Sequence, residues 1–168
     1  MSWLKMMLVG LAISAVASSG AMAAQATAEI KSATGEILGT VTLTETPHGV
    51  LLLADLMRIP PGSHGFHIHE KGACAPDFKA AGGHFNPAGK GHGINHSDGS
   101  HAGDMPNLHA AADGSVKAEM LNVNVTIAPG ANSIFDGDGA AIVLHAKADT
   151  YGANAGAGAR LACGVIKN

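Results

Sequence analysis

Short runs of apolar residues alternate with polar residues through the first third of the sequence, up to about residue 58. A period of two places successive side chains on opposite faces, which is typical of β-strands and not of helices. Turn residues interrupt the runs at Thr34 and Gly35 and again at 47–49. This pattern predicts an antiparallel meander. The apolar positions are Ala26, Ala28 and Ile30, then Ile37, Val41 and Leu43, then residues 50–53.

The rest of the sequence continues the strand pattern, with two exceptions. Asp113 and Gly114 form a strong hairpin signal between two of the later strands. Eight short strands with few helical stretches favour a sandwich or closed barrel. The segments 71–107 and 146–160 do not fit as strands, and such long loops are usually functional. The later strands are expected at 64–70, 108–111, 115–121, 139–145 and 161–166.

The N-terminus has the features of a secretory signal peptide. Lys5 precedes an apolar run at 6–16, and small residues end in Ala21-Met22-Ala23. The apolar run is too short for a membrane span. We expect a signal peptide at 1–23, cleavage after Ala23, and one domain at 24–168 in the periplasm without stable membrane association. A buried N-terminal helix is the alternative, but no helical pattern continues after Ala23.

Charge and cysteine content limit the partners and the compartment. The chain has ten Lys and Arg against thirteen Asp and Glu, and no basic run, so nucleic acid is not an expected partner. The only cysteines are Cys74 and Cys163. In an exported protein a disulfide between them is the default, with two free thiols as the alternative. The disulfide would also anchor the loop that follows Cys74.

A glycine-rich loop carries three histidines and one aspartate with the spacing of a metal site. His84, His92, His101 and Asp104 are four ligands that suit a tetrahedral divalent ion, and zinc is the first hypothesis. His96 lies in the same loop, so spacing alone does not decide which imidazoles bind. A loop that is merely rich in solvated histidines is the alternative.

A second pair of histidines lies on one predicted strand. Phe66 and Ile68 are expected to face the core, so His67 and His69 share the opposite, outward face. Two imidazoles on one strand face form a preformed chelate. His145 ends another apolar strand and is the best further ligand. An all-imidazole set suits copper, zinc or iron, and a square arrangement favours copper(II).

Five motifs in this order resemble the copper/zinc superoxide dismutases, in particular their bacterial periplasmic branch. The resemblance covers about residues 28–166. The motifs are Gly-Phe-His-Ile-His-Glu at 65–70, Gly-His-Phe-Asn-Pro at 83–87, His-Gly at 92–93, His-Ala-Gly-Asp at 101–104 and Gly-Ala-Arg-Leu-Ala-Cys-Gly at 158–164.

The resemblance implies which residues bind each of two metal ions. Copper would be held by His67, His69, His84 and His145, and zinc by His84, His92, His101 and Asp104. His84 would then be an imidazolate that bridges one copper and one zinc per chain. Asp149, which looks like a solvated loop acid by itself, would link His67 and His92. His64 would be structural, whereas His48, His96 and His109 have no assigned role.

The resemblance also implies the fold and the reaction. The fold is all-β, an eight-stranded antiparallel Greek-key β-barrel of the immunoglobulin-like sandwich type with two long functional loops. The reaction is dismutation of superoxide, in which copper cycles between two oxidation states and His84 carries a proton. Arg160 would draw in the anion. Relatives occur as monomers or homodimers. The alternative function is a periplasmic copper and zinc buffer protein, which needs the histidines but not Arg160.

Overall fold

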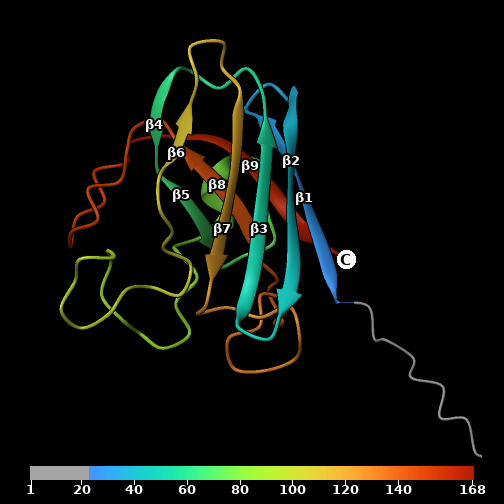
Figure 1. The fold of residues 1–168 in the computed structure, drawn as a ribbon, viewed down its shortest axis with the longest axis vertical. Coiled ribbons are helices and arrows are strands. Elements are labelled where there is room, and N and C mark those ends of the chain that lie inside the picture. Colours follow the sequence, from blue (N-terminus) through green and yellow to red (C-terminus); the bar gives the residue numbers. More distant parts are fainter. Residues whose placement is uncertain (1–22) are drawn as a thin grey trace, which may run out of the picture.

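The structure is a computed structural model that describes residues 23–168, so residues 1–22 of the expected signal peptide lie outside it. The described part is built from strands and one short 3-10 helix (Figure 1). None of its helices has the length and apolar character needed to cross a membrane. The strands are β1 Gln25–Ser32, β2 Ile37–Thr46, β3 Gly49–Leu56, β4 Gly62–His64, β5 Phe66–His69, β6 Leu108–Ala110, β7 Val116–Asn122, β8 Ala141–His145 and β9 Arg160–Lys167, and the helix is η1 Phe78–Ala81.

Seven strands form one curled antiparallel sheet in the order β5-β8-β9-β1-β2-β3-β7, and β4 pairs with β6. The meander expected from the first third of the sequence is confirmed, because β1, β2 and β3 pair in succession. Two connections then cross: β3 leads to β4 in the small second sheet, and β7 at one edge of the large sheet leads to β8, next to the other edge. Such crossings give the Greek-key arrangement that was expected.

The structure has nine strands in its described part, because the strand expected at 64–70 is divided at Gly65. Before this residue β4 pairs with β6, and after it β5 pairs with β8. Gly65 itself accepts a hydrogen bond from the amide of His145 and donates one to the carbonyl of Lys147. The chain therefore changes partner strand at Gly65, which brings the two ends of the curled sheet together.

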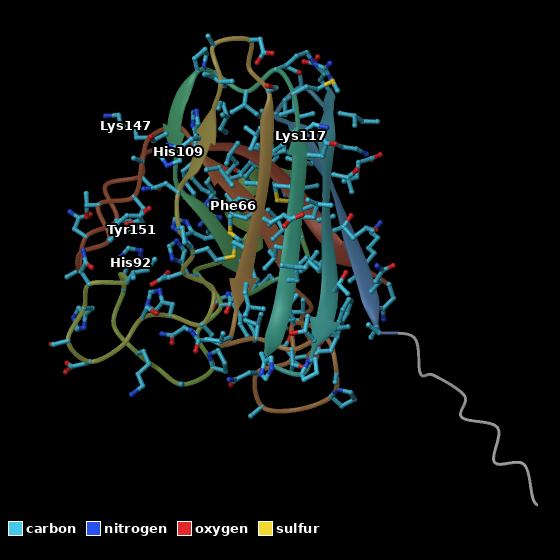
Figure 2. The ribbon with its side chains drawn as sticks, in the orientation of Figure 1. Phe66, His92, His109, Lys117, Lys147 and Tyr151 are labelled. Atoms are coloured by element: carbon cyan, nitrogen blue, oxygen red, sulfur yellow. A yellow bond between two sulfur atoms is a disulfide. The ribbon has the colours of Figure 1, made fainter. Side chains whose placement is uncertain are left out.

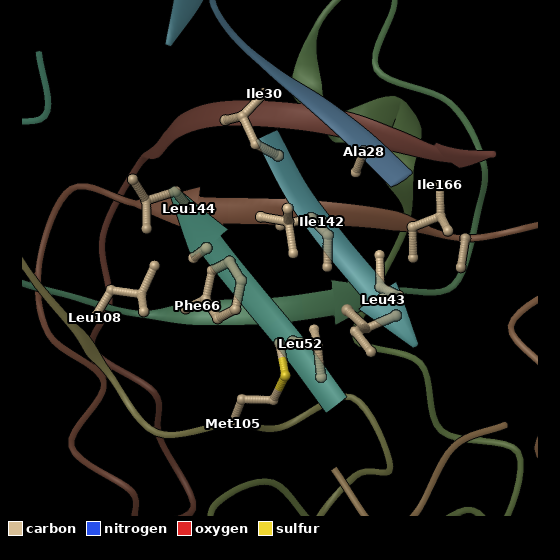
Figure 3. Packing of buried hydrophobic residues seen from close by; sticks show 14 of the residues in the cluster. Ala28, Ile30, Leu43, Leu52, Phe66, Met105, Leu108, Ile142, Leu144 and Ile166 are labelled. Carbon is tan, nitrogen blue, oxygen red and sulfur yellow. The ribbon is translucent and has the colours of Figure 1, made fainter. Parts of the chain in front are cut away.

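The core fills the inside of the curled sheet (Figure 3). Alternate residues of β1 and β3 are buried, as the period of two predicted. Phe66 and Ile68 are fully buried and confirm the expected inner face of β5. Burying a large apolar side chain contributes about 1.5–3 kcal/mol. Other large core residues are Leu43, Leu52, Leu108, Ile142 and Leu144.

The two long loops meet on one side of the sheet, where Figure 2 places His92 near Tyr151. The first runs from β5 to β6 and contains η1, and the second joins β8 to β9. The amide of Asn95 donates to the carbonyl of Tyr151 at 2.9 Å, so the loops are hydrogen-bonded to each other. Most of the residues that the sequence marked as functional lie where these loops cover the sheet.

Candidate metal centre

Strand β5 presents its two histidines to the space beneath the loops. His67 and His69 share the face opposite to Phe66, as expected, but this outward face is not exposed to solvent. His67 is 0% exposed and His69 is 1% exposed. The reason is tertiary: the loops cover that face and replace water around both imidazoles.

Backbone pairing holds the first long loop, which carries His84, His92, His101 and Asp104 and is called the zinc-type loop below, on the free edge of β5. Phe85 donates to the carbonyl of Ile68 at 2.9 Å, and Ile68 donates to the carbonyl of Gly103 at 3.0 Å. These bonds make bridges between His69 and His84 and between His67 and Asp104. The sheet edge therefore places loop ligands directly beside strand ligands.

Gly103 is required at the tightest point of this pairing. A Cβ at this position would lie 2.2 Å from the carbonyl oxygen of Ile68 and 3.1 Å from the amide nitrogen of Phe85. Backbone atoms on both sides leave no room for a side chain. The glycine in the motif His-Ala-Gly-Asp thus allows the loop to approach the strand.

Four imidazoles form the first ligand group: His67, His69, His84 and His145. One nitrogen from each lies within 4.8 Å of the others. The rings of His67 and His84 are stacked with centroids 4.0 Å apart, and His145 places its ring 4.9 Å from that of His67. The structure therefore brings together the four residues that the resemblance assigned to copper.

Each strand histidine of this group uses its other nitrogen for a hydrogen bond that points away from the group. His67 Nε2 lies 2.7 Å from Asp149, His69 Nδ1 lies 3.0 Å from the Gly82 carbonyl, and His145 Nδ1 lies 3.4 Å from the Gly158 carbonyl. Carbonyl and carboxylate oxygens accept, so these nitrogens carry the hydrogens. The remaining nitrogens are left with lone pairs that face one another.

Asp104 organises the second ligand group. Its Oδ1 lies 2.7 Å from His84 Nδ1, 3.3 Å from His101 Nδ1 and 3.7 Å from His92 Nε2. Its Oδ2 accepts from the amides of Gly93 and His101. The carboxylate thus gathers the three loop histidines that the sequence marked. By distance alone, the four residues here that could hold an ion are His67, His84, His92 and Asp104, so His67 lies within that set and His101 outside it.

The buried imidazoles are held neutral and the carboxylate is held charged. Burial, helped by the neighbouring His84, lowers the pKa of His69 to about 3, and burial lowers the pKa of His145 to about 4. Burial also lowers the pKa of His101. Burial by itself would raise the pKa of Asp104, but hydrogen bonds from His84 and Gly93 bring it well below its usual range. Neutral imidazole and ionised carboxylate are the forms that bind metals.

In the described part of the chain, five buried imidazole nitrogens of these groups make no hydrogen bond, although His92 Nε2 lies 3.0 Å from Asp149 and His101 Nδ1 lies 3.3 Å from Asp104. Buried polar atoms are nearly always paired, so a cluster of unpaired ones calls for a missing ligand. Two divalent ions, one in each group, would accept these lone pairs. The atoms are His67 Nδ1, His69 Nε2, His92 Nε2, His101 Nδ1 and His145 Nε2.

Asp149 lies between the two groups and is only 5% exposed. Its Oδ2 is 2.7 Å from His67 Nε2 and 3.0 Å from His92 Nε2. The prediction from local sequence that Asp149 is a solvated loop residue is therefore wrong. Its position between His67 and His92, which the resemblance implied, agrees with the structure. Burial of this carboxylate is a product of the contact between the two loops.

Arg160 is the first residue of β9 and lies opposite His145 in the β8–β9 pairing. Its guanidinium donates to the carbonyls of Phe78 and Gly82, each at 2.5 Å. It lines an open cleft together with residues of η1 and of the second loop, including Lys79 and Gly158. Burial lowers the pKa of Arg160, and the nearby Asp77 opposes this shift. The guanidinium cation of Arg160 is thus fixed beside the first ligand group, which includes His69 and His145.

The expected disulfide between Cys74 and Cys163 is present. Cys163 is on β9, and it packs with Val143 of β8 and Phe78 of η1 in a small apolar cluster. The disulfide therefore fastens the start of the first loop and η1 to the sheet. This is the same part of the loop whose carbonyls hold Arg160.

The other histidines have local roles. His64 ties backbone segments together, with Nδ1 2.8 Å from the His145 carbonyl and Nε2 2.7 Å from the Pro60 carbonyl. His109 pairs with Ser63, and His96 accepts from the amide of Asp98. His48 is exposed. His48, His96 and His109 join neither ligand group.

Two residues near the site were missed by sequence reasoning, Asn107 and Tyr151. Asn107 exchanges two hydrogen bonds with the backbone of Asp149, and the Tyr151 hydroxyl accepts from the Asn107 amide. Their only signal in the sequence is proximity, because Asn107 follows Asp104 by three residues and Tyr151 follows Asp149 by two.

Comparison with known proteins agrees with this geometry. A family model described as copper/zinc superoxide dismutase matches residues 37–166. A protein named copper-zinc superoxide dismutase from Caulobacter vibrioides is 47% identical over 148 residues, covering 84% of this chain and 85% of the relative. One named copper-zinc superoxide dismutase 2 from Aquifex aeolicus is 45% identical, covering 85% and 86%.

Solved structures show the same fold. The copper/zinc superoxide dismutase from Brucella abortus has a TM-score of 0.73 at 31% identity, covering 86% of this chain and all (100%) of that one. A double mutant of a superoxide dismutase-like protein from Bacillus subtilis has a TM-score of 0.80 at 39% identity, covering 84% and 97%.

The fold and the paired histidine groups define a metalloenzyme of the oxidoreductase class that uses copper and zinc. The chain belongs to the copper/zinc superoxide dismutase family, in its bacterial type.

Proposed function

We propose that this protein dismutates superoxide to oxygen and hydrogen peroxide at one copper ion that is joined to one zinc ion through His84. The observation that carries the proposal is the group of unpaired nitrogens on His67, His69 and His145 beside His84, with Arg160 fixed alongside. A site with these donors fits copper and zinc, because imidazole suits both and a carboxylate completes a tetrahedral zinc set.

The two ligand sets divide at His84. We assign His67, His69, His84 and His145 to copper, since the three strand histidines present lone pairs to one another. We assign His84, His92, His101 and Asp104 to zinc. His67 is close to both groups, but its Nε2 donates to Asp149, which leaves only Nδ1 for a metal. His101 Nδ1 lies 3.3 Å from Asp104 and completes the zinc set.

Copper, when bound, supplies the one-electron redox chemistry, and the balanced reaction consumes two superoxide ions and two protons. Arg160 brings the anion in. Its charge is permanent, and two carbonyls hold it beside His69 and His145. The full chain has a formal net charge of −3, so a local positive field is needed to attract an anion.

His84 handles a proton. Its Nδ1 lies 2.7 Å from Asp104, and its ring stacks on that of His67 with the centroids 4.0 Å apart. An imidazole that spans both sets can take up a proton on one side and deliver it to reduced substrate. Asp104 and Asp149 orient the rings that take part, which is the usual task of carboxylates beside ligand histidines.

We further propose export to the periplasm after removal of residues 1–23, on the strength of the charged, apolar and small-residue pattern of the N-terminus. The mature chain works as a monomer or a homodimer, without nucleic acid and without stable membrane association. N-terminal sequencing of the protein from a periplasmic fraction tests the cleavage site, and analytical ultracentrifugation distinguishes the two oligomeric states.

The function is tested by superoxide removal and elemental analysis on the same sample. Metal-free protein is loaded with zinc alone, copper alone or both. We expect one copper and one zinc per chain, and activity only when copper is present. Binding of both metals without any superoxide removal would instead indicate a metal buffer protein. Binding of a single metal in total would contradict the bridged site.

A further inference from the structure

We propose that Asn107 and Tyr151 form a positioning clamp that holds Asp149 between the two metal sets and thereby sets the affinity for zinc. The proposal rests on the zinc assignment above. It concerns residues that touch neither proposed metal set directly and that act through Asp149.

Asn107 holds the backbone of Asp149 from both sides. Its Oδ1 accepts from the Asp149 amide at 2.7 Å, and its Nδ2 donates to the Asp149 carbonyl at 3.0 Å. A side-chain amide bound to both the N–H and the C=O of one residue fixes the position and rotation of that residue. The carboxylate of Asp149 then has little freedom to leave His67 and His92.

Tyr151 closes the clamp. Its hydroxyl accepts from the backbone amide of Asn107 at 2.8 Å, while its own backbone amide donates to Asp149 Oδ1 at 2.7 Å. Its carbonyl accepts from Asn95 in the zinc-type loop. Tyr151 is therefore hydrogen-bonded to Asn107, to the carboxylate of Asp149 and to the loop that carries His92.

The backbone of Tyr151 supports a positioning role. Its φ is +64°, a left-handed conformation that is rare for a bulky residue. Such a conformation persists only where surrounding contacts require it, and it is concentrated at functional sites. Here the three hydrogen bonds of Tyr151 supply the requirement.

The clamp should act more on zinc than on copper. His67 lies on β5, is fully buried and is fixed by strand pairing. His92 lies in a loop, and its contacts with the second loop are the Gly152 carbonyl at 2.8 Å and Asp149 at 3.0 Å. Both contacts belong to the segment that the clamp positions, so loss of the clamp frees His92 and leaves His67 in place.

The test measures zinc affinity of metal-free protein with zinc alone, by competition with a chromophoric chelator. Tyr151→Phe removes only the hydroxyl and should weaken zinc about threefold to tenfold, as expected for one hydrogen bond. Asn107→Ala should weaken zinc about 10-fold to 100-fold, the range for residues that orient metal ligands. In the double variant the effects should not multiply, because both residues belong to one network.

Ser115→Ala is the control. It also removes a hydroxyl, from the hairpin turn between β6 and β7, where the Ser115 side chain bonds only to Asp113. Zinc affinity should change by less than about twofold. Two further readouts support the clamp: faster hydrogen exchange of the Asn107 amide in Tyr151→Phe alone, and an altered ligand-field spectrum of cobalt(II) in the zinc site of Asn107→Ala.

The outcomes separate the clamp from the function on which it rests. Unchanged zinc affinity in both variants, with wild type binding zinc normally, overturns the clamp. An equal loss of copper and zinc affinity also overturns it, because that result indicates general loss of structure. Failure of the wild type to bind zinc overturns the zinc assignment itself.

Discussion

Arg160 and His69 share one hydrogen-bond acceptor, the carbonyl oxygen of Gly82. The guanidinium lies 2.5 Å from this oxygen and His69 Nδ1 lies 3.0 Å from it. The carbonyl therefore sets the tautomer of His69, a proposed copper ligand, together with the position of Arg160, the cation proposed to attract superoxide. Gly82 follows η1, which the disulfide cluster fastens to the sheet.

The first prediction concerns Arg160. Arg160→Ala should keep both metals and lower the second-order rate about tenfold or more, since steering by a local field raises association rates 10-fold to 1000-fold. Arg160→Lys should fall between wild type and Ala, because it keeps the charge and loses the planar fork. Arg160→Glu should be slowest.

The measurement for Arg160 is the rate at matched copper content as a function of ionic strength. Salt should slow wild type more than Arg160→Ala, because screening acts on a field that the variant lacks. Lys117→Ala is the control. It removes one positive charge whose side chain is 80% exposed on β7, and it should behave like wild type. Equal rates and salt dependence for wild type and Arg160→Ala would refute the role.

The disulfide is the subject of the second prediction. Replacing Cys74 and Cys163 by Ser should lower the free energy of unfolding by about 2–5 kcal/mol, because the bond closes a loop with a sequence separation of 89. Loosening η1 should also release the carbonyls that hold Arg160. We therefore expect a lower rate per bound copper as well as a lower denaturation midpoint. A stability loss with an unchanged rate per copper would show that Arg160 is positioned without η1.

Gly103→Ala should break the pairing between the first loop and β5. The added Cβ would meet the Ile68 carbonyl at 2.2 Å, so backbone must move, at a cost of about 1–3 kcal/mol or more. The shift should reduce zinc content first, because Asp104 follows Gly103. Gly130→Ala is the control, since its Cβ meets nothing within 4 Å. Denaturant unfolding and elemental analysis measure both effects, and equal behaviour of the two variants would contradict the argument.

The zinc half of the site can be removed separately. Asp104→Asn and His101→Ala should lower zinc content at least tenfold at limiting zinc while most copper remains. The physical reason is that both residues belong only to the proposed zinc set. His96→Ala tests whether any loop histidine matters, because His96 lies in the same loop and belongs to neither proposed metal set. Zinc loss in His96→Ala as large as in His101→Ala would show that the ligand assignment is wrong.

The stability of the metal-free protein should fall as the pH is lowered from about 6.5 towards 4. Burial lowers the folded-state pKa of His69 to about 3 and that of His145 to about 4, against 6.5 for the unfolded chain. The unfolded chain therefore binds more protons in this range, so stability is full above 6.5 and is lost on acidification. Each histidine contributes a slope of up to about 1.4 kcal/mol per pH unit.

Urea unfolding of metal-free protein at several pH values measures this slope. The exposed His109 supplies the control, because His109→Ala should leave the slope unchanged. Stability that does not vary between pH 7 and pH 5 would contradict the neutral, buried state of the strand histidines. Loaded protein should resist acidification further, because bound metal competes with protons for the same nitrogens.

Local patterns were sufficient for much of the fold and for most candidate ligands. Alternation in β1 to β3 predicted the meander, because side-chain direction in a strand depends only on neighbouring residues. The same alternation placed His67 and His69 together. The ordered motifs then supplied the division into two metal sets through the resemblance, which spacing alone left open at His96.

Long-range contact decided the rest. The sequence does not show that His67 and His69 are buried, because the loops that cover them come from 71–107 and 146–160. The burial of Asp149 and its clamp by Asn107 require two segments 42 residues apart to meet. The division of the strand expected at 64–70 into β4 and β5 likewise depends on tertiary structure, because the two parts pair with different strands. Hydrogen bonds and desolvation between distant segments arise only when the sheet curls, so tertiary structure alone determined the environment that turns these side chains into a metal centre.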